Sequence, residues 1–188
     1  MIIGVTGTIG AGKETVVQYL KKKGFEMFSF SRMIRQEALK RGYAMDRASL
    51  EKVGDLLREE YGDEAIFAKR IIEKIKKKGI KDASIDGIRQ PWEIEEFKKN
   101  GDFRLIAIDA DQKLRFDRTR NRGKPSDQTE FEKFKFFDEK EYYGKGNTHQ
   151  QIKASMDMAD FHIKNNGSFE ELFKKIDDIL GKIRKGQD

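Results

Sequence analysis

Apolar residues along this chain alternate between short continuous runs and a helical spacing of three and four positions. The short runs, rich in β-branched and aromatic residues, predict strands at 1–6, 25–30, 82–87, 103–109 and 161–163. The helical spacing begins at residue 15 and continues at 31–41, 47–61, 64–78, 91–99, 111–123, 131–143, 150–158 and 168–180. Because strands and helices alternate, we expect an α/β fold with a five-stranded, mostly parallel sheet and a single domain over 1–188.

The stretch 31–80 is the exception, since it contains no convincing strand although it lies between two predicted strands. A crossover between parallel strands needs only one helix, so we interpret this region as an insertion of the kind that carries a substrate site. The tail from Gly181 to Asp188 is polar, and we expect it to fray.

Composition narrows the possible partners and the compartment. Charged residues make up 38% of the chain, and the net charge is +6, which favours anionic partners such as nucleotides, nucleic acid or an acidic membrane. No cysteine is present, which excludes disulfides and zinc–thiolate sites and fits a reducing compartment such as the cytoplasm. We expect no signal peptide, because Met1 begins the first core strand, and no apolar run approaches membrane-spanning length.

A glycine-rich turn joins the first predicted strand to the first predicted helix, with the spacing Gly7-x-x-x-x-Gly12-Lys13. Gly7, Gly10 and Gly12 have no Cβ, so backbone N–H groups here, including that of Ala11, can turn towards an anion and approach it closely. The helix N-terminus adds its partial positive charge. Strand, turn and helix together predict a phosphate-binding loop in which Lys13 reaches the outer phosphates of a nucleoside triphosphate.

Glu14 departs from the usual form of such a loop, because a Ser or Thr that ligates Mg²⁺ normally follows the lysine. Here the hydroxyl comes one residue later, at Thr15. Two interpretations of Glu14 stay open: it holds Mg²⁺ through water, or it points to solvent as an acidic residue in the first helical turn.

Asp86 ends the third predicted strand, and Arg89 follows three residues later. Ligands of open α/β sheets bind at the carboxyl ends of strands, so Asp86 is placed to face the loop and to orient Mg²⁺-bound water or an acceptor. Arg89 can bind an acceptor phosphate through its guanidinium fork. Arg35 and Arg58, in the helical insertion, either clamp the same phosphate or are ordinary helix-surface arginines.

Three arginines, Arg115, Arg118 and Arg122, share one face of the helix predicted at 111–123. We expect Arg118 and Arg122 to close over the donor and to stabilise the transferring group, although ordinary helix-surface positions remain an alternative. For Arg115 the ordinary position is favoured, because only one side of the helix can face the site.

Two other sets of residues are expected to be structural. The first is an aromatic stripe at helical spacing, which indicates packing: Phe131, Phe134 and Phe137. The second is a pair of lone histidines without metal-ligand spacing: His149 and His162.

These motifs resemble those of the nucleoside monophosphate kinases, a group of P-loop proteins. The loop GTIGAGKETV is similar to theirs, and an acidic residue after the lysine is similar to phage-type deoxynucleoside monophosphate kinases. RASLEKVGDLLREEYGDE and IDGIRQPWEIEEF resemble the acceptor-side helices and the third strand of that group. MADFHIKNNGSFEELFKKI is similar to dephospho-CoA kinases, and the whole chain looks closest to dephospho-CoA-kinase-like proteins of archaeal type.

The resemblance implies the three-layer fold of P-loop NTPases, ATP as phosphoryl donor and Mg²⁺ as cofactor. It implies a core at 1–30, 81–110 and 147–188, an acceptor-binding helical region at 31–80 and a closing helical lid at 111–146.

The resemblance also assigns roles to individual residues. It implies that Asp86 and Arg89 form the acceptor-side pair, and that Thr15 touches the donor phosphates. Thr15 and Asp86 are then the residues that hold Mg²⁺, in part through water, while Asn166 and Gly167 form the loop near the adenine.

Three functions stay open at this point: phosphorylation of a nucleoside or deoxynucleoside monophosphate, phosphorylation of dephospho-CoA, and an ATP-dependent regulatory or nucleic-acid-binding switch. The segment GIRQP follows the third strand where dephospho-CoA kinases carry a leucine-rich loop, which favours a mononucleotide acceptor. No nucleic-acid-binding motif occurs and the positive charge is spread, so we expect small nucleotides and not nucleic acid as partners. Monomer and homodimer both remain open.

Overall fold

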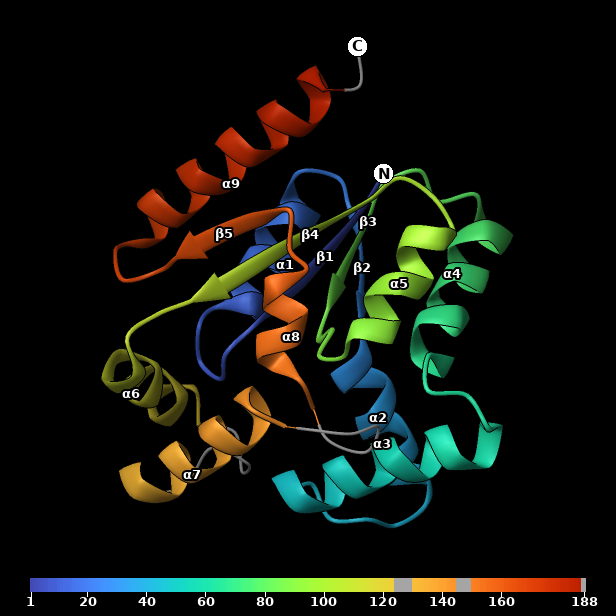
Figure 1. Cartoon of the computed structure of the whole chain (residues 1–188), viewed down its shortest axis with the longest axis vertical. Helices are drawn as coiled ribbons and strands as arrows, with labels where there is room; N and C mark the ends of the chain where they lie inside the picture. Colours follow the sequence, from blue (N-terminus) through green and yellow to red (C-terminus); the bar gives the residue numbers. More distant parts are fainter. Residues whose placement is uncertain (124–129, 145–149, 187–188) are drawn as a thin grey trace.

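The structure is a computed structural model that describes residues 1–123, 130–144 and 150–186. Its five strands form one sheet in which every paired strand runs parallel to its neighbour. They are β1 (Ile2–Gly7), β2 (Glu26–Ser29), β3 (Ala83–Asp86), β4 (Phe103–Asp109) and β5 (Phe161–Lys164). The spatial order is β2-β3-β1-β4-β5, so the strand that leads into the glycine-rich loop lies at the centre (Figure 1). The expected α/β fold with a parallel sheet is confirmed.

Helices cover both faces of this sheet and give the molecule three layers (Figure 1). One face is covered by α1 (Lys13–Lys22) and α9 (Phe169–Lys185). The other is covered by α4 (Ile66–Lys78) and α5 (Pro91–Lys99), in which Pro91 occupies the first helical position, as predicted.

Neighbouring residues of a strand point to opposite faces, so the central strands serve two hydrophobic cores. Ile2 and Leu105 belong to the core beneath α4 and α5, whereas Ile3 and Ile106 belong to the core beneath α1 and α9. Burying such a side chain contributes about 1.5–3 kcal/mol. If a strand shifted by one residue along its neighbour, its side chains would point to the opposite faces of the sheet. The alternation between the two cores therefore fixes the pairing register of the strands.

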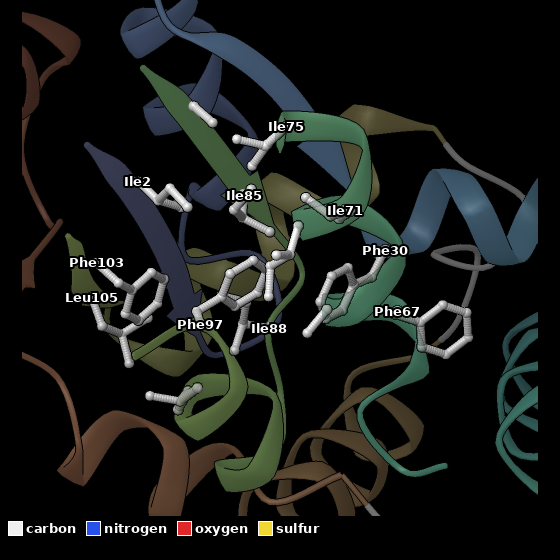
Figure 2. Close-up of a cluster of buried hydrophobic side chains, with 14 of the residues drawn as sticks. Ile2, Phe30, Phe67, Ile71, Ile75, Ile85, Ile88, Phe97, Phe103 and Leu105 are labelled. Atoms are coloured by element: carbon white, nitrogen blue, oxygen red, sulfur yellow. The ribbon is translucent and has the colours of Figure 1, made fainter. Parts of the chain in front are cut away.

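The helical insertion packs on the sheet as part of the first core. Besides α4 it comprises α2 (Phe30–Lys40) and α3 (Arg47–Tyr61). Phe30 lies 6.3 Å from Phe97 between ring centroids, and Phe97 stacks on Phe103 of β4 at 5.2 Å (Figure 2). This aromatic row connects the start of α2 to the sheet, and it therefore fixes α2 relative to the strand ends.

The described part of the chain contains three further helices: α6 (Gln112–Arg122), α7 (Phe131–Tyr142) and α8 (Ile152–Asp157). Ile9 of the glycine-rich loop, Phe116 of α6 and Phe134 of α7 form a third buried cluster, with Phe131 and Phe137 packed against it. The aromatic stripe is thus a packing surface, as predicted. Within the described ranges, no helix is long and apolar enough to cross a membrane.

The last helix continues to Lys185, past the predicted end at Leu180. The expectation of a frayed tail from Gly181 is therefore wrong as far as Lys185. Ile183 is only 4% exposed and joins the same core as Ile176, so apolar residues at helical spacing hold this last turn in place.

Candidate functional site

A cavity of about 670 Å³ opens where β1 and β3 end. The glycine-rich loop, the residues after β3, helices α2 and α6 and the turn before α9 contribute to its lining. Among the residues that the structure describes, the charged ones in its lining are six bases and two acids: Lys13, Arg35, Arg47, Arg89, Arg118 and Arg122 against Glu14 and Asp86. This excess of positive charge around one cavity suits a ligand, or a pair of ligands, with several negative charges.

The glycine-rich loop (residues 7–13) has a shape that side chains would prevent. A Cβ on Gly7 would lie 1.9 Å from the carbonyl oxygen of Ile108 on β4. Gly12, at the N-cap of α1, has a φ of 106°, which L-residues rarely adopt. The loop therefore wraps the N-terminus of α1 with its backbone exposed to the cavity, as a phosphate cradle requires.

The Lys13 ammonium group folds back over this loop. Its Nζ donates to the carbonyl oxygens of Gly7 at 2.7 Å and Thr8 at 2.8 Å. Burial, and next the nearby positive charge of Arg89, lower the pKa of Lys13 to about 7. A negative ligand beside Nζ would raise the pKa of Lys13 again, because it stabilises the charged ammonium form. The electrostatics of Lys13 therefore favour a bound anion.

Asn165 fixes the loop from the side, and sequence reasoning did not single it out. Its Nδ2 donates to the carbonyl oxygen of Ala11 at 2.8 Å, and the side chain lines the cavity. Of the two residues expected near the adenine, Asn166 and Gly167, only one lines the cavity. Gly167 lines the cavity, whereas Asn166 Oδ1 accepts from the backbone N–H of Asp111 at 3.0 Å.

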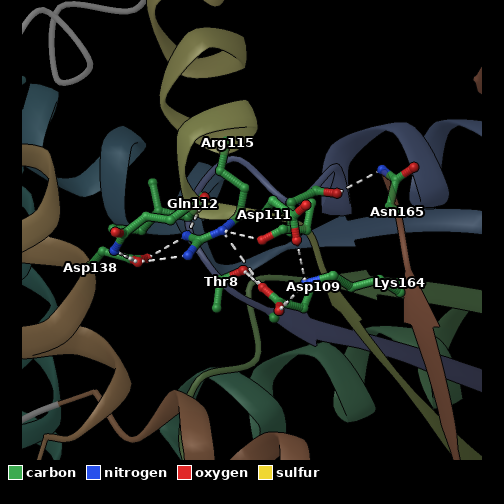
Figure 3. A network of polar contacts seen from close by, with 12 residues as sticks. Thr8, Asp109, Asp111, Gln112, Arg115, Asp138, Lys164 and Asn165 are labelled. Atoms are coloured by element: carbon green, nitrogen blue, oxygen red, sulfur yellow. Dashed lines mark hydrogen bonds and ion pairs between the residues drawn. The ribbon is translucent and has the colours of Figure 1, made fainter. Parts of the chain in front are cut away.

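A polar network joins the loop to the helices of the predicted lid (Figure 3). Thr8 Oγ1 donates to Asp109 Oδ1 at 2.5 Å. Arg115 donates to the carbonyl oxygen of Ile9 at 3.0 Å and to both carboxylate oxygens of Asp138, at 2.5 and 2.7 Å. Arg115 does not line the cavity, so its role here is structural. It is only 5% exposed, so the ordinary helix-surface position favoured from the sequence is wrong.

The end of β3 and the residues after it form another part of the cavity wall. Asp86 and Arg89 both line the cavity, and Ser29 Oγ donates to Asp86 Oδ2 at 3.4 Å. Arg35 of α2 lines it too, together with Arg47, the first residue of α3. The position of Arg47 was not predicted, because nothing in the local sequence separates it from other helix arginines.

A smaller cavity of about 110 Å³ shares part of this wall, namely Ser31, Arg35, Arg47, Gly87 and Arg89. Its other lining includes apolar residues of α2 and α3 and several carboxylates: Phe30, Ile34, Leu50, Glu51, Asp55, Glu93 and Glu141. A ligand bound at the arginines could therefore extend between α2 and α3, inside the helical insertion.

Arg58 lines only the smaller of these two cavities, where it shares the lining with Arg35 and Arg89, the residues with which the sequence suggested a common phosphate clamp. Its guanidinium lies 3.3 Å from Asp55 and 3.2 Å from the buried Glu93. Glu93 in turn accepts from the backbone N–H of Arg89 at 3.0 Å. The Arg58–Glu93 pair therefore supports the backbone that carries Arg89.

Arg118 and Arg122 of α6 both line the large cavity. Arg118 Nη1 donates to the carbonyl oxygen of Asn165 at 2.9 Å. Because Asn165 also holds the glycine-rich loop, Arg118 lies at the side of the cavity where Gly167 and Phe169 are found. Phe169 is 65% exposed, and its exposed ring beside this turn was also not predicted.

Oxygen donors suited to a magnesium ion line the same cavity. Glu14, Thr15 and Asp86 offer two carboxylates and one hydroxyl, which are hard ligands of the kind Mg²⁺ takes. Among the described residues, no group of three or more His, Cys, Asp or Glu side chains could hold a metal ion alone. The donor set thus fits an ion that is bound mainly by nucleotide phosphates.

Comparison with known proteins gives the family and the fold. A family model described as an AAA domain matches residues 3–143. The UPF0200 protein of Thermococcus kodakarensis is 34% identical over 193 residues, which cover 97% of this chain and 100% of that protein. The UPF0200/UPF0201 protein of Archaeoglobus fulgidus is 36% identical over 191 residues, which cover 98% of this chain, but the chain spans only 56% of that relative's length.

Solved structures with this arrangement include kinases. A shikimate kinase from Bacteroides thetaiotaomicron superposes with a TM-score of 0.61 at 14% identity, over 96% of this chain and 98% of that one. A deoxyadenosine kinase from M. mycoides gives a TM-score of 0.57 at 16% identity, over 97% and 100%. The fold is therefore that of the P-loop kinases, while the expected closeness to dephospho-CoA kinases is not shown by these comparisons. The chain belongs to the AAA-domain family matched by residues 3–143 and to the UPF0200 proteins.

Proposed function

We propose that this protein transfers a phosphoryl group from ATP to a small phosphorylated acceptor, a nucleoside or deoxynucleoside monophosphate. One observation carries the proposal: Lys13 and the glycine-rich loop line the same cavity as Arg35, Arg47 and Arg89. Arg89 lies close enough to Lys13 to lower its pKa, so the cations of this cavity suit two phosphorylated ligands bound next to one another. The kinase folds of the structural neighbours, one of them a deoxyadenosine kinase with dCMP and dCDP as products, support the same reaction class.

The donor would bind at the glycine-rich loop. Backbone N–H groups of residues 7–13 and the Lys13 ammonium would hold its β- and γ-phosphates. Mg²⁺ bound to these phosphates would neutralise part of their charge, and Thr15 and Asp86, with Glu14 through water, are the residues that would hold it. The exposed Phe169 and the Arg118 side chain would flank the base of the nucleotide at the Gly167 end.

The acceptor would bind at Arg35, Arg47 and Arg89, with its phosphate on their guanidinium groups. An oxygen of that phosphate would form a bond to the γ-phosphorus while the bond between this phosphorus and the β–γ bridging oxygen breaks, leaving ADP and a diphosphate product. Arg89 would hold the acceptor in line, and Arg118 and Arg122 would stabilise the charge on the transferring group. Asp86, which lines the cavity together with Arg89, would orient the reactants.

An ADP-release assay with ATP, Mg²⁺ and a panel of acceptors tests this function. The panel contains the common ribo- and deoxyribonucleoside monophosphates and dephospho-CoA, with a reaction lacking acceptor as control. The proposal predicts ADP release that depends on one group of monophosphates. Preference for dephospho-CoA would reassign the acceptor, and ADP release at the same rate without any acceptor would indicate an ATPase or switch instead.

A further inference from the structure

A carboxylate from α7, Glu141, lines the smaller cavity beside the arginines that the two cavities share. Arg89 Nη1 donates to Glu141 Oε2 at 2.9 Å, and Arg47 Nη2 lies 3.3 Å from Glu141 Oε1. Each oxygen of this carboxylate thus faces a different guanidinium group. Glu141 is 7% exposed, so the bridge is largely shielded from water.

The three partners come from separate parts of the chain. Arg47 begins α3, Arg89 follows β3, and Glu141 lies in the last turn of α7. The Arg47 guanidinium also lies 5.8 Å from the ring centroid of Phe137, one helical turn before Glu141, and Arg89 Nη1 also donates to Gln150 Oε1. The two guanidinium groups are therefore held in a fixed relation by their shared contact with Glu141 and by these further partners.

The charges around this bridge favour a phosphate over the carboxylate that now fills it. Arg47 and Arg89 both contact the single negative charge of Glu141, and Arg35 lines the same two cavities as these arginines. A phosphate monoester carries a charge of about −1.5 to −2 at pH 7 and three acceptor oxygens. It can accept from two guanidinium forks at once, which makes short, charge-assisted hydrogen bonds.

We propose that Arg47 and Arg89 together bind the phosphate of the acceptor, and that Glu141 fills this site until the phosphate displaces it. The inference rests on the proposed function and narrows it, because it names the residues that select the acceptor. A neutral alcohol cannot replace a bridging carboxylate, because it brings no negative charge to the two guanidinium groups. A carboxylate acceptor brings the same charge as Glu141, so it gains nothing by displacing it. A phosphate adds charge and hydrogen bonds, so Glu141 makes the site selective for phosphorylated acceptors.

Calorimetric titration with inorganic phosphate tests this site, with saturating ADP and Mg²⁺ present to fill the donor loop. Glu141→Gln keeps the shape of the side chain but removes the competing charge, so phosphate should bind several-fold tighter. Arg47→Ala should bind phosphate about tenfold more weakly, since it loses a charged hydrogen-bond donor. Glu139→Gln, an exposed carboxylate of the same helix, should match the unaltered protein.

Acetate provides the second arm, and it should bind much more weakly than phosphate to every variant. The inference would be overturned if acetate bound as tightly as phosphate. It would also be overturned if neither Arg47→Ala nor Glu141→Gln changed the affinity for phosphate. If Arg47→Ala does not fold, Arg47→Lys replaces it, because lysine keeps the charge but loses the fork. The titration needs no turnover, so it separates failure of this site from failure of the proposed function: phosphate affinities can respond as predicted even when no acceptor is phosphorylated.

Discussion

Arg115 and Asp138 form a buried ion pair that joins α6 to α7, with both carboxylate oxygens accepting from one guanidinium fork. Removing one partner of a buried pair leaves the other charge without compensation, which costs about 3–5 kcal/mol. We therefore expect Arg115→Ala to lower the free energy of unfolding by about this amount in urea titrations. Arg120→Ala, at an exposed position of the same helix, should change it by less than about 1 kcal/mol. A small effect of Arg115→Ala would mean that the pair does not hold these helices.

Asn165 and Asn166 offer a matched test of the loop support. Asn165→Ala removes the donor to the carbonyl oxygen of Ala11, so we expect ATP to bind about tenfold more weakly. Asn166→Ala removes a contact with Asp111 at an exposed position and should leave ATP affinity within about twofold. Fluorescence titration with a labelled ATP analogue measures both. Equal losses in the two variants would contradict the assignment of Asn165.

Phe169 provides an exposed aromatic surface at the end of the cavity where the donor base is proposed to lie. Stacking of a base on an aromatic ring contributes about 1–3 kcal/mol, so Phe169→Ala should raise the KM for ATP by about tenfold or more. The KM for the acceptor should stay the same. Phe136→Ala, at an aromatic residue of α7 that is 63% exposed, serves as the control and should change neither value. An unchanged KM for ATP in Phe169→Ala would exclude this base site.

Glu93 makes stability depend on pH. Burial raises the pKa of this carboxyl above its ordinary value of 4.5, although Arg58 partly offsets the effect. The folded protein then binds more protons at Glu93 than the unfolded chain does, so this group's contribution to stability falls as pH rises from about 4.5 through the folded pKa. Glu93→Gln should flatten that decline in urea unfolding measured across this range. Glu95→Gln, an exposed neighbour in α5, should keep the original slope, and an equal slope in Glu93→Gln would contradict the account.

The sheet and the glycine-rich loop were predictable because their signals are local. The strand Phe103–Asp109 is rich in apolar residues that follow one another in the sequence. Gly7, Gly12 and Lys13 likewise lie within one short stretch of sequence. The end of α9 was not predicted, because most residues of the tail are polar. The helix continues there because one apolar residue of the tail, Ile183, is buried in the core.

The arginines show where sequence reasoning reaches its limit. Arg47 and Arg58 lie in the same helix and have similar surroundings in sequence, yet only Arg47 lines the large cavity. The difference comes from partners far along the chain, since Glu93 engages Arg58 and Glu141 engages Arg47. No local pattern carries that information. Asn165 was missed for the same reason, because its role depends on the distant carbonyl oxygen of Ala11.

The proposed function requires one cavity to hold donor and acceptor together and to pass the phosphoryl group directly between them. The most direct measurement follows the label of γ-phosphate-labelled ATP into products, for the unaltered protein, Arg89→Ala and the control Arg104→Ala. The account predicts label in the acceptor diphosphate, a rise of about tenfold or more in the acceptor KM for Arg89→Ala with little change for ATP, and normal kinetics for Arg104→Ala. Label released as inorganic phosphate whether or not an acceptor is present, or an Arg89→Ala variant with normal acceptor kinetics, would contradict it.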